Sequence, residues 1–398
     1  MHVKKKCLLI LPRKIFPYVG GYPQKNKKLI EILNKHYDLS VVIISNSKIT
    51  SEEKDFFNNN TAEFYYFTIS KLKYLCKAFL SVFSRESVHV AYFYFDEVSS
   101  IIDKILPQQD IAVGVYVRTM KYLQNAPDNC KVIFDMTDSI GLNYKNSQKL
   151  VSSLFWRLFY MFESGKLLRH EKYWVERADV TLLFNRDERD YWQKYGNARL
   201  VPHGVNEKLL TYNTYSEKYD KSVVFLGKMD YQPNIDAVKW YVKNIHGKIG
   251  SKIPFIIAGA CPTHEIFKLA ENNSNITVTG FVEDPFVILK SAMAVVAPMQ
   301  TGSGIQNKVL EAMALGSINV ITPLAAKAIV GAEDGKDFLI AGNAQEFCEK
   351  ITDIADNPGK YGKIKTSSRE FIAKNYTWQN YEHVYISEIE RTTRNAKH

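Results

Sequence analysis

The sequence APMQTGSGIQNKVLEAMALG (Ala297–Gly316) joins an apolar strand, a glycine-containing loop and a helix that is expected to end at the final glycine. Gly302 and Gly304 allow the loop backbone to approach a ligand closely, and free N–H groups at the helix start favour an anion such as a nucleotide diphosphate. Lys308 adds positive charge in the first turn of the helix. Glu311 lies three residues later on the same face, where its carboxylate can accept hydrogen bonds from ribose hydroxyls. The segment therefore predicts a phosphate-binding loop beside a charged helix.

The same segment has a plainer interpretation. A glycine loop before a helix is often only a tight turn, and a Lys–Glu pair three residues apart often lies in solvent. The segment is neither GxGxxG nor GxxxxGK[ST], so it supports neither a dinucleotide-dependent dehydrogenase nor a P-loop protein.

Apolar runs of strand length alternate with helical patterns along the chain, which is typical of doubly wound parallel sheets. In the helical stretch QKNKKLIEILNKH, the residues Leu29, Ile30 and Leu33 fall on one face. The alternation starts again after the polar segment 211–222, so we expect a domain junction near residues 204–221. Two such α/β domains that face one another would leave a ligand cleft at the carboxyl ends of their strands. The runs expected to form strands are KKCLLILP, LSVVIIS, VAYFYF, IAVGVYV, KVIFDM and VTLLFN in the first half, and SVVFLG, PFIIAG, ITVTGF, AVVAPM, INVIT and DFLIAG in the second.

The composition is that of a globular protein: the 398 residues are 46% hydrophobic and 24% charged, enough to bury substantial cores. The five cysteines are scattered and include no CxxC pair, which argues against a disulfide framework or a zinc site and favours a reducing compartment. The apolar run from Cys7 to Leu11 is too short for a secretory signal. No stretch approaches about eighteen apolar residues, so no transmembrane helix is expected. We therefore expect a cytoplasmic protein whose contact with a membrane can only be peripheral.

Positive charge is concentrated in the first half of the chain. Residues 1–200 hold 30 Lys and Arg against 21 Asp and Glu, whereas the remaining residues hold 22 against 21. A basic half suggests an anionic partner, such as nucleic acid, an anionic membrane surface or a phosphorylated acceptor, although a solvated basic surface explains it equally well. The sequence contains no zinc-finger or RNA-recognition motif, so we expect no nucleic-acid partner.

The segment Ala297–Gly316 resembles the donor-binding segment of family-four glycosyltransferases of the GT-B type. The shared features are the Gly-x-Gly loop, Lys308, Glu311, the Ala-Met-Ala that follows, and the last glycine before INVIT. The resemblance covers essentially the whole second half, and several weak motifs in the right order are more specific than any one alone. The other similar stretches are PYVGGYPQKNKKLIEIL (Pro17–Leu33), VVFLGKMDYQPNIDAVKW (Val223–Trp240), ITVTGFVED (Ile276–Asp284), GAEDGKDFLIAGNAQEFCEKI (Gly331–Ile351) and FIAKNYTW (Phe371–Trp378).

The resemblance implies a GT-B fold of class α/β, with two facing Rossmann-like domains, parallel sheets and a cleft between them. It implies an N-terminal acceptor-binding domain at 1–205, a C-terminal nucleotide-sugar donor-binding domain at 206–375, and a C-terminal helix at 376–398 that can pack back on the N-terminal domain. It also implies that Gly20 and Gly21 lie near the donor phosphates, although a simple turn explains these glycines as well. The residues that it implies for donor binding are Gly227, Lys228, Gly280, Phe281, Val282, Gly302, Ser303, Gly304, Lys308 and Glu311.

Some positions depart from the family pattern. Ser303 stands where relatives carry the first Glu of a Glu-x7-Glu pair, so backbone N–H groups of the loop or the Ser303 hydroxyl must replace that carboxylate. Lys228 can stand for the first member of the usual Arg…Lys pair on the diphosphate. Tyr231 and its neighbours occupy the second position, so Lys308 would supply the other charge. Gln24 stands where an Arg often follows the first loop.

Two acidic residues are the candidates for catalysis. The segment VIFDMTDSIGLNY (Val132–Tyr144) places Asp135 and Asp138 at the end of an apolar strand that should face the cleft. A carboxylate there could accept the proton of the acceptor hydroxyl or stabilise positive charge on the transferred sugar. The alternative is a helix N-cap, which Asp138 or Ser139 would serve. The pattern DMTD is not Asp-x-Asp and no His is near, so we expect no metal ion.

The stretch Lys149–Trp174 is rich in aromatic residues, with basic residues between them. One interpretation is an interfacial surface near a lipid-linked acceptor. The alternative, which we favour, is a set of core-packing helices with solvated basic edges. Glu163 and Glu171 could pair with these bases, and His203 at the domain junction is expected to be structural. The basic residues are Arg157, Lys166, Arg169 and Lys172.

These features predict a glycosyltransferase that moves a sugar from a UDP- or GDP-linked nucleotide sugar to a hydroxyl of a glycan or lipid-linked acceptor, with no cofactor and no metal. The resemblance implies retention of anomeric configuration and a role in surface polysaccharide, lipopolysaccharide or glycolipid biosynthesis, at the inner face of the cell membrane. Two alternatives stay open. One is a nucleotide-sugar 2-epimerase of the same architecture, although its catalytic His and carboxylates are not recognisable here. The other is a non-catalytic nucleotide-sugar-binding partner, suggested by Ser303 and the incomplete basic pair.

Overall fold

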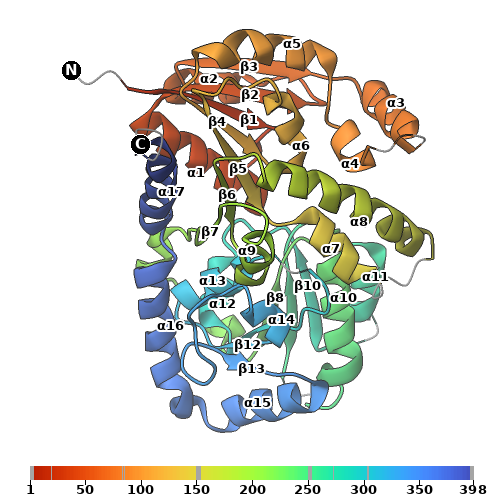
Figure 1. The fold of residues 1–398 in the computed structure, drawn as a ribbon. Coiled ribbons are helices and arrows are strands. Elements are labelled where there is room, and N and C mark those ends of the chain that lie inside the picture. Colours follow the sequence, from red (N-terminus) through yellow and green to blue (C-terminus); the bar gives the residue numbers. More distant parts are fainter. Residues whose placement is uncertain are drawn as a thin grey trace. The chain divides into compact units, whose positions relative to one another are not determined.

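The computed structural model describes residues 4–18, 20–82, 84, 86–148, 154–249, 253–271, 273–302 and 304–394. The chain forms two compact units (Figure 1). Unit 1 comprises Met1–Val201 together with Glu382–His398, and unit 2 comprises Pro202–Tyr381. Each unit has a parallel sheet and a hydrophobic core of its own.

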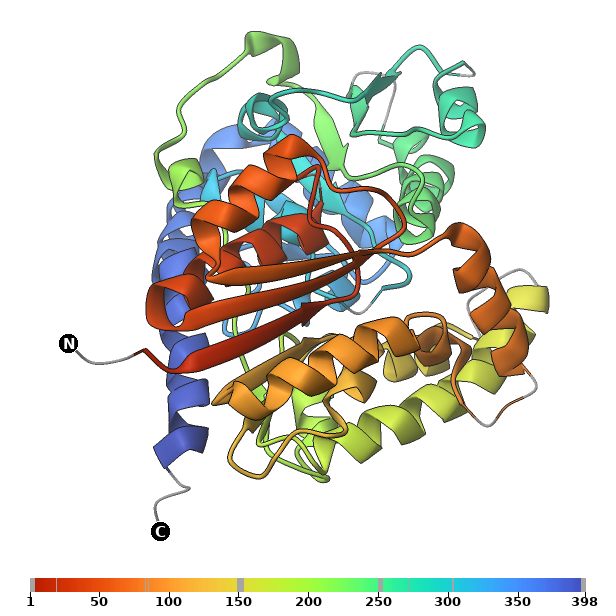
Figure 2. The same cartoon turned by 90° about the horizontal axis from the view of Figure 1, so that it is seen from above.

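The sheet of unit 1 has seven strands in the order β3-β2-β1-β4-β5-β6-β7, all paired in parallel. The chain builds outward from β1 first in one direction and then in the other, which is the Rossmann order. β1 pairs with β2 on one side and with β4 on the other, so the order reverses at β1 and β4. The central strands are apolar because helices cover both faces of the sheet, as Figure 2 shows. The strands are β1 (Lys6–Leu11), β2 (Asp38–Ser45), β3 (Glu63–Thr68), β4 (Ile111–Val115), β5 (Lys131–Thr137), β6 (Val180–Leu183) and β7 (Ala198–Leu200).

One strand predicted for unit 1 is wrong. The run VAYFYF (residues 90–95) begins within a short helix and continues as turns. Ser87 caps this helix, because its hydroxyl oxygen accepts hydrogen bonds from the backbone N–H groups of His89 and Val90. The outer strand of the sheet is instead β3, with the equally aromatic sequence EFYYFT. The helices of unit 1 are α1 (Gly21–His36), α2 (Ser51–Asn60), α3 (Lys71–Val82), α4 (Val88–Ala91), α5 (Asp96–Ile105), α6 (Val117–Met120), α7 (Ile140–Ser147), α8 (Leu154–Val175) and α9 (Arg186–Trp192).

The sheet of unit 2 repeats the Rossmann order with six parallel strands, β10-β9-β8-β11-β12-β13. All six apolar runs predicted for the second half form strands, so the predicted pair of doubly wound parallel sheets is confirmed. The strands are β8 (Val223–Leu226), β9 (Phe255–Ala258), β10 (Ile276–Gly280), β11 (Ala294–Ala297), β12 (Asn319–Ile321) and β13 (Leu339–Ile340).

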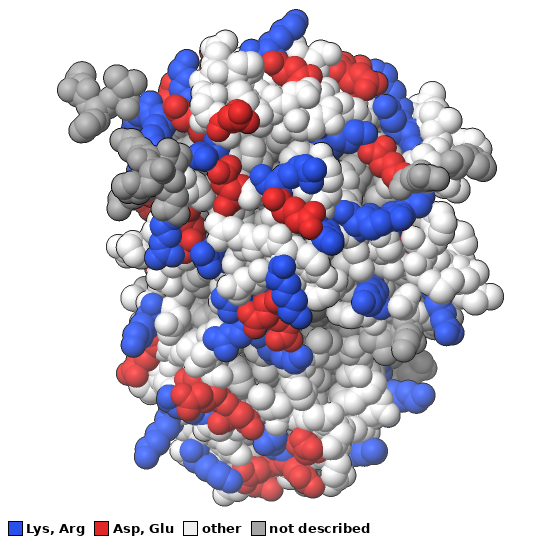
Figure 3. Space-filling view, in the orientation of Figure 1, with Lys and Arg blue, Asp and Glu red and all other residues white. Residues whose placement is uncertain are grey.

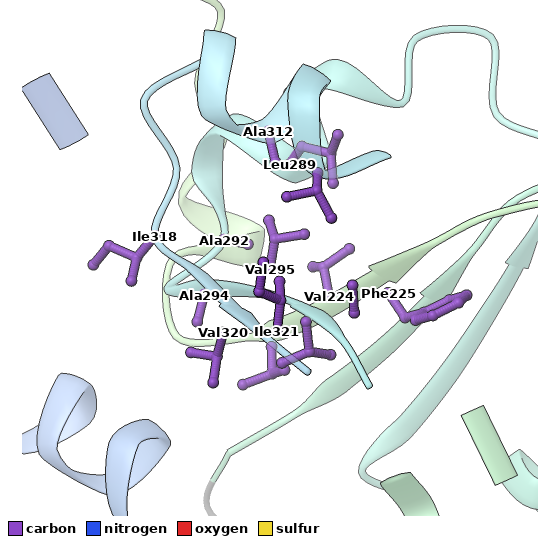
Figure 4. Packing of buried hydrophobic residues seen from close by; sticks show 14 of the residues in the cluster. Val224, Phe225, Leu289, Ala292, Ala294, Val295, Ala312, Ile318, Val320 and Ile321 are labelled. Atoms are coloured by element: carbon purple, nitrogen blue, oxygen red, sulfur yellow. The ribbon is translucent and has the colours of Figure 1, made fainter. Parts of the chain in front are cut away.

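The core of unit 2 lies between this sheet and the helices on its faces. In Figure 4, Val224 of β8 and Val295 of β11 pack near Leu289 of α12 and Ala312 of α13. All four side chains are buried, so the two central strands are held against the helix that follows the glycine loop. The helices of unit 2 are α10 (Gln232–Tyr241), α11 (His264–Glu271), α12 (Phe286–Ser291), α13 (Asn307–Ala314), α14 (Pro323–Ala326), α15 (Ala344–Asp356) and α16 (Gly362–Asn375).

The last helix, α17 (Trp378–Arg394), begins in unit 2 and belongs to unit 1 from Glu382 onward. Glu382 accepts hydrogen bonds from Lys35 and His36 at the end of α1, at 2.5 and 2.8 Å. Farther along α17, the Tyr385 hydroxyl donates to Asp135 at the end of β5, at 3.1 Å. The C-terminal helix therefore contacts two elements of unit 1, and one of the contacts is a residue predicted to be catalytic.

Candidate functional site

The strand order of unit 2 reverses between β8 and β11, and the loops after these two strands hold most of the predicted donor residues. In doubly wound sheets, ligands bind outside the carboxyl ends of the strands at this reversal. Gly227 and Lys228 follow β8 directly, and residues 298–306 lead from β11 into α13. The fold thus brings together, within one unit, two segments that are far apart in the sequence.

Helix α13 starts without a side-chain cap. Its N-cap residue, Gln306, makes no capping hydrogen bond, so another acceptor can take the first backbone N–H groups of the helix. In the preceding loop, Gly302 has a φ of +90°, a conformation that favours glycine, and the carbonyl of Gly304 accepts a hydrogen bond from the Gln306 side chain. Ser303 lies outside the described residues. At the other end, the predicted cap is confirmed, because Gly316 has a φ of +71°.

Lys308 is buried, and its ammonium nitrogen donates a hydrogen bond to Oδ1 of Asn234 at 2.7 Å. The same nitrogen lies 4.2 Å from the centroid of the Phe225 ring. Burial lowers the pKa of Lys308 to about 7, and the carboxylate of Glu311 opposes this shift. Among the described residues, no carboxylate lies within 4.0 Å of this nitrogen, so its charge remains available to an anion.

Glu311 is half-buried on the same helix. Burial raises its pKa to about 7, and Lys308 opposes the rise. The two side chains therefore form a desolvated pair of opposite charges, and the interpretation of a pair lying in solvent is wrong for Lys308.

Asn234 belongs to this site, although the sequence analysis did not identify it. It is buried in the first turn of α10, where Oδ1 accepts from Lys308 and Nδ2 donates to the carbonyl of Lys228 at 2.9 Å. Gly227 packs against it, since a Cβ at residue 227 would lie 2.7 Å from Nδ2 of Asn234. The signal that could have revealed this residue is an amide directly after a proline, at the start of the helix that follows the β8 loop.

The remaining predicted donor residues lie at the carboxyl edge of the same sheet. Lys228 is exposed, and its ammonium pairs with Asp230 at 2.8 Å, so it must exchange this partner to contact a diphosphate. Gly280 ends β10 with a φ of +67°. The next residue, Phe281, has 71% of its surface exposed, and Val282 is half-buried. An exposed ring at this edge is able to stack on a nucleotide base.

In unit 1, Gly20 and Gly21 form the start of α1. Gly20 has a φ of +94° and makes no side-chain cap, and a Cβ added to it would meet no atom within 4 Å. The backbone conformation of this turn therefore favours glycine, and no described atom fills the space beside the Gly20 Cα. The uncapped N-terminus of a 16-residue helix is a favourable place for an anion, so the turn and phosphate interpretations are compatible.

The first acidic candidate, Asp135, is buried and already occupied by partners within unit 1. Its carboxylate accepts hydrogen bonds from Lys25, from the Thr137 hydroxyl at 2.9 Å and from the Tyr385 hydroxyl at 3.1 Å. Lys25 is also buried, and burial lowers its pKa while Asp135 opposes the shift. Lys25 was not predicted as a site residue, although its position one helical turn before Leu29 places it on the buried face of α1. The ion pair with Lys25 of α1 and the hydrogen bond from Tyr385 of α17 indicate that Asp135 has a structural role within unit 1.

The second acidic candidate, Asp138, is half-buried, and within the described part of the chain its Oδ1 makes no hydrogen bond. Burial raises its pKa to about 6; Lys25 opposes the rise, whereas Asp135 adds to it. Of the two predicted helix caps, Ser139 is the one that forms, because its hydroxyl oxygen accepts from the backbone N–H of Leu142 at 3.2 Å. The carboxylate of Asp138 is therefore not used to cap α7.

Residues 154–174 of the aromatic stretch lie in α8, whereas residues 149–153 lie outside the described residues. The prediction that the glutamates of this stretch pair with its basic residues is wrong. Glu163 accepts a hydrogen bond from the backbone N–H of His89 at 2.9 Å, and Glu171 accepts one from that of Gly141 at 3.1 Å. Lys166 is buried and donates to two backbone carbonyls that follow α3, at 2.7 and 3.1 Å. The second half of α8 thus packs in the core, whereas its first turns expose large apolar side chains. These exposed residues are Leu154, Phe155, Trp156, Leu158, Met161 and Phe162.

Three further observations bear on the predictions. Within the described ranges, no group of three or more His, Cys, Asp or Glu side chains could hold a metal ion. In the same residues, no helix is both long enough and apolar enough to cross a membrane. His203 is buried with its ring 5.1 Å from that of Trp378, which is the packing of a structural residue.

The comparisons with known proteins agree with this architecture. Residues 220–357 match the family described as "Glycosyl transferases group 1". The structure is similar to HepE of Anabaena, solved in complex with UDP-glucose, with a TM-score of 0.66 and 12% identity over 97% of this chain and all of HepE. It is also similar to sucrose-phosphate synthase from Thermosynechococcus elongatus, with a TM-score of 0.71 and 14% identity over 99% of this chain and all of that one. For TarM, the TM-score is 0.69 and the identity 12%, over 97% of this chain and 99% of TarM. A comparison with curated protein sequences gave no match.

The fold is that of the GT-B glycosyltransferases, and residues 220–357 match a glycosyltransferase family. The resemblance drawn from the sequence is confirmed: both units have the Rossmann strand order of the GT-B fold, and residues 220–357 match the group 1 glycosyltransferase family.

Proposed function

We propose that this protein transfers a glycosyl group from a nucleoside diphosphate sugar to a hydroxyl of a glycan or lipid-linked acceptor. One observation carries the proposal. A buried cation, Lys308, and a half-buried carboxylate, Glu311, lie at the strand-order reversal of the unit that matches the glycosyltransferase family. Such a reversal is where nucleotides bind in related folds, and HepE, solved with UDP-glucose, has the same fold.

In this proposal the donor diphosphate lies at the uncapped start of α13. Lys308 pairs with a phosphate oxygen, and the diphosphate restores the full charge that burial suppresses. Glu311 accepts hydrogen bonds from the ribose hydroxyls, and the exposed ring of Phe281 stacks on the base. Lys308 and the first N–H groups of α13 would neutralise the departing diphosphate, so we propose transfer without a metal ion.

The reaction breaks the bond between C1 of the sugar and the diphosphate oxygen, and it forms a bond from C1 to the acceptor oxygen. The acceptor hydroxyl loses its proton in the same process. We assign the catalytic carboxylate to Asp138 rather than Asp135, because Asp138 has an oxygen without a partner among the described residues and a pKa of about 6. A carboxylate with these properties can take the proton near neutral pH or stabilise positive charge on the sugar. Retention of configuration is part of the proposal through the family resemblance.

We propose that unit 1 contacts an anionic membrane through what we call its apolar end. The apolar end consists of α3 and the first turns of α8, which reach the same end of unit 1 in Figures 1 and 2. Helix α3 exposes Leu72, Leu75, Phe79, Leu80 and Val82, in addition to the six exposed residues of α8. Figure 3 shows few charged side chains over the start of α8, whereas elsewhere on that face basic and acidic side chains alternate.

Exposed apolar side chains with nearby cations are typical of an interfacial surface. Lys71 of α3 and Arg157 of α8 are exposed, and each would gain about 1 kcal/mol near an anionic lipid surface. This supports a lipid-linked acceptor and a place at the inner face of the cell membrane, in the synthesis of a surface polysaccharide, lipopolysaccharide or other glycolipid.

The experiment that tests the function is a donor screen with product detection. Purified protein is incubated with UDP-, GDP- and ADP-linked sugars, with and without a membrane lipid extract, while nucleoside diphosphate release and labelled lipid product are measured. We expect one donor to give product that depends on the extract and persists in EDTA. Sugar release without an acceptor product, or product that needs added magnesium or manganese, would contradict the proposal.

A further inference from the structure

The strand order of unit 1 also reverses, between β1 and β4, and an arginine follows each of these strands. Arg13 lies two residues after β1, and Arg118 lies three residues after β4. Because the carboxyl ends of parallel strands meet at one edge of the sheet, the two guanidinium groups lie at the ligand-binding position of unit 1. Neither arginine lies in a motif that the sequence alone makes recognisable.

Arg13 is exposed but held in place by an aromatic ring. Its guanidinium carbon lies 4.0 Å from the centroid of the Tyr22 ring, and the Tyr22 hydroxyl donates to the Arg13 carbonyl at 2.7 Å. Tyr22 stacks in turn on Tyr116, with ring centroids 5.8 Å apart. Tyr116 has a φ of +61°, which is rare for a residue with a bulky side chain, and its backbone N–H donates to the Asp135 carbonyl. The two tyrosines thus bridge the loop after β1 and the loop after β4.

Arg118 is half-buried and held from the other side. Its Nε donates to Nε2 of His89 at 2.6 Å, and its guanidinium carbon lies 4.8 Å from the centroid of the Phe93 ring. Since Nε2 accepts this bond, His89 is neutral and carries its proton on Nδ1. Burial lowers the pKa of His89 well below its ordinary value, and both arginines add to this shift, so the ring stays a neutral acceptor. The contact orients the guanidinium without neutralising it.

In the part of the chain that the structure describes, neither arginine has an acidic partner. Within the described residues, no carboxylate lies within 4.0 Å of either guanidinium, although sixteen other ion pairs involving lysine, arginine or histidine side chains occur in the same part of the chain. Burial lowers the pKa of Arg118, and the nearby charge of Arg13 lowers it further, so the two positive charges repel one another. Two oriented, unneutralised guanidinium groups are the arrangement that binds a phosphoryl group through paired N–H···O bonds. Solvated arginines would need neither the aromatic contacts nor the histidine.

We propose that Arg13 and Arg118 bind a phosphoryl group of the acceptor substrate. The inference rests on the proposed function in treating unit 1 as the acceptor side, and it specifies the acceptor as a phosphate-bearing molecule. Asp138, the proposed catalytic carboxylate, follows β5, the strand next to β4, so an acceptor anchored at the arginines would have its hydroxyl near that residue. The phosphate can belong to a lipid headgroup or to a water-soluble phosphomonoester, and the two sources share the same chemistry at the site.

The test compares Arg13→Gln and Arg118→Gln with the matched control Arg177→Gln. Arg177 is an exposed arginine of unit 1 that stacks on Tyr173 at 3.6 Å, but it lies just after α8 and not at the carboxyl edge of the sheet. Binding of inorganic phosphate is followed by ³¹P NMR line broadening with UDP present in excess, so that the donor site is occupied. Sedimentation with vesicles of phosphatidic acid in phosphatidylcholine, against phosphatidylcholine alone, provides the lipid arm.

We expect each glutamine variant to weaken phosphate binding about tenfold or more, as loss of a charge-assisted pair does, with UDP affinity unchanged and the control equal to the wild type. If only the phosphatidic acid arm responds to the substitutions, the phosphate belongs to a lipid headgroup. If only the inorganic phosphate arm responds, the phosphate belongs to a water-soluble molecule.

Unchanged binding in both arms overturns the proposal. A parallel loss of UDP affinity also overturns it, because the arginines would then hold the donor diphosphate. If Arg118→Gln fails to fold, the test relies on Arg13→Gln alone, because Arg13 is exposed and its replacement should not prevent folding. A wild type that binds phosphate but no nucleotide would leave this site intact and refute the proposed function instead.

Discussion

The ammonium nitrogen of Lys308 donates a 2.7 Å hydrogen bond to Oδ1 of Asn234, a residue 74 positions earlier in the chain. The bond joins the first turn of α13 to the first turn of α10, and Nδ2 of Asn234 continues to the carbonyl of Lys228. A buried ammonium group without a hydrogen-bond acceptor is costly, so this amide is what allows a lysine to stay buried at the proposed phosphate site.

The first prediction concerns Asn234. Asn234→Ala leaves both the Lys308 ammonium and the Lys228 carbonyl without this partner, so we expect a loss of about 1–3 kcal/mol in unfolding free energy and weaker donor binding. Denaturant unfolding and calorimetric titration with the donor measure the two effects. The matched control is Asn244→Ala, since Asn244 donates at 2.8 Å to the carbonyl of Trp240 within its own helical segment. Equal behaviour of the two variants would refute the bridging role.

The second prediction follows from the lowered pKa of Lys308. The free site holds Lys308 with a pKa of about 7, and a bound diphosphate favours the ammonium form, so binding takes up a proton above about pH 7. Affinity for a nucleotide sugar, whose diphosphate does not titrate in this range, should therefore fall from about pH 7 to about pH 8.5. Titration in two buffers of different ionisation enthalpy measures the proton uptake.

A substitution at Glu311 should shift the pH range over which donor affinity is lost. Its carboxylate raises the pKa of Lys308, so Glu311→Gln should lower that pKa further and move the loss of affinity to lower pH. The amide can still accept a hydrogen bond from ribose, so the variant should bind better than Glu311→Ala. An affinity that stays constant or increases across this pH range would show that Lys308 does not contact the diphosphate.

The third prediction separates the two aspartates. Asp138 has a folded-state pKa of about 6 against an ordinary value of 3.8, so the folded state favours its protonated form. The stability of the wild type should therefore decrease as pH rises between these two values, and ionised Asp138 costs stability above them. We expect Asp138→Asn to be more stable than the wild type at about pH 7.5, with a smaller difference at about pH 4.5, and to lose turnover. The exposed Asp128→Asn is the control.

Asp135→Asn should behave in the opposite way. It breaks a buried ion pair with Lys25, so we expect a loss of about 3–5 kcal/mol in unfolding free energy. Thermal and denaturant unfolding of both variants at the two pH values provide the comparison. If Asp138→Asn keeps full turnover while a folded Asp135→Asn loses it, the catalytic assignment is reversed.

Much of this architecture could be predicted from local sequence, and the misses have physical causes. All six strands of unit 2 were predicted, because an apolar run buried on both faces needs no information from distant residues. The aromatic runs EFYYFT and VAYFYF look alike, yet only the first is a strand. The second follows Ser87, whose side chain caps a helical turn, and this local hydrogen bond decides against the strand.

The part of the proposed site that lies in one segment could be inferred from the sequence, whereas contacts between two distant segments could not. The glycine loop, Lys308 and Glu311 lie within a few residues of one another, so their pattern is visible in the sequence. Asn234 acquires its role only through contact with Lys308, and Arg13 becomes a partner of Arg118 only when the sheet brings β1 beside β4. Partners of this kind come from tertiary structure, which periodicity and spacing do not encode.

The fourth prediction concerns the apolar end of unit 1. Replacing Leu75, Phe79, Phe155 and Met161 by Ser removes exposed apolar surface without opening the core, so folding should be retained. We expect this variant to lose sedimentation with anionic vesicles at low salt, and the wild type to be released as salt rises. Phe267→Ser, an exposed aromatic position of unit 2, is the matched control. Lys166 is unsuitable for such a test because it is buried and bonded to backbone carbonyls. A wild type that ignores anionic vesicles would favour a water-soluble acceptor.

The central claim is that a nucleoside diphosphate binds at the start of α13. Calorimetric titration of UDP and GDP into the wild type, Lys308→Ala and Lys239→Ala tests it most directly. Lys239 is an exposed lysine of the same unit that pairs with Glu265, so its loss controls for a general change of charge. The account predicts that one nucleotide binds the wild type and the Lys239 variant equally, and binds Lys308→Ala about 10- to 100-fold more weakly, with thermal unfolding still cooperative. Equal affinity of all three proteins for that nucleotide, or no binding of either nucleotide to the wild type, would contradict it.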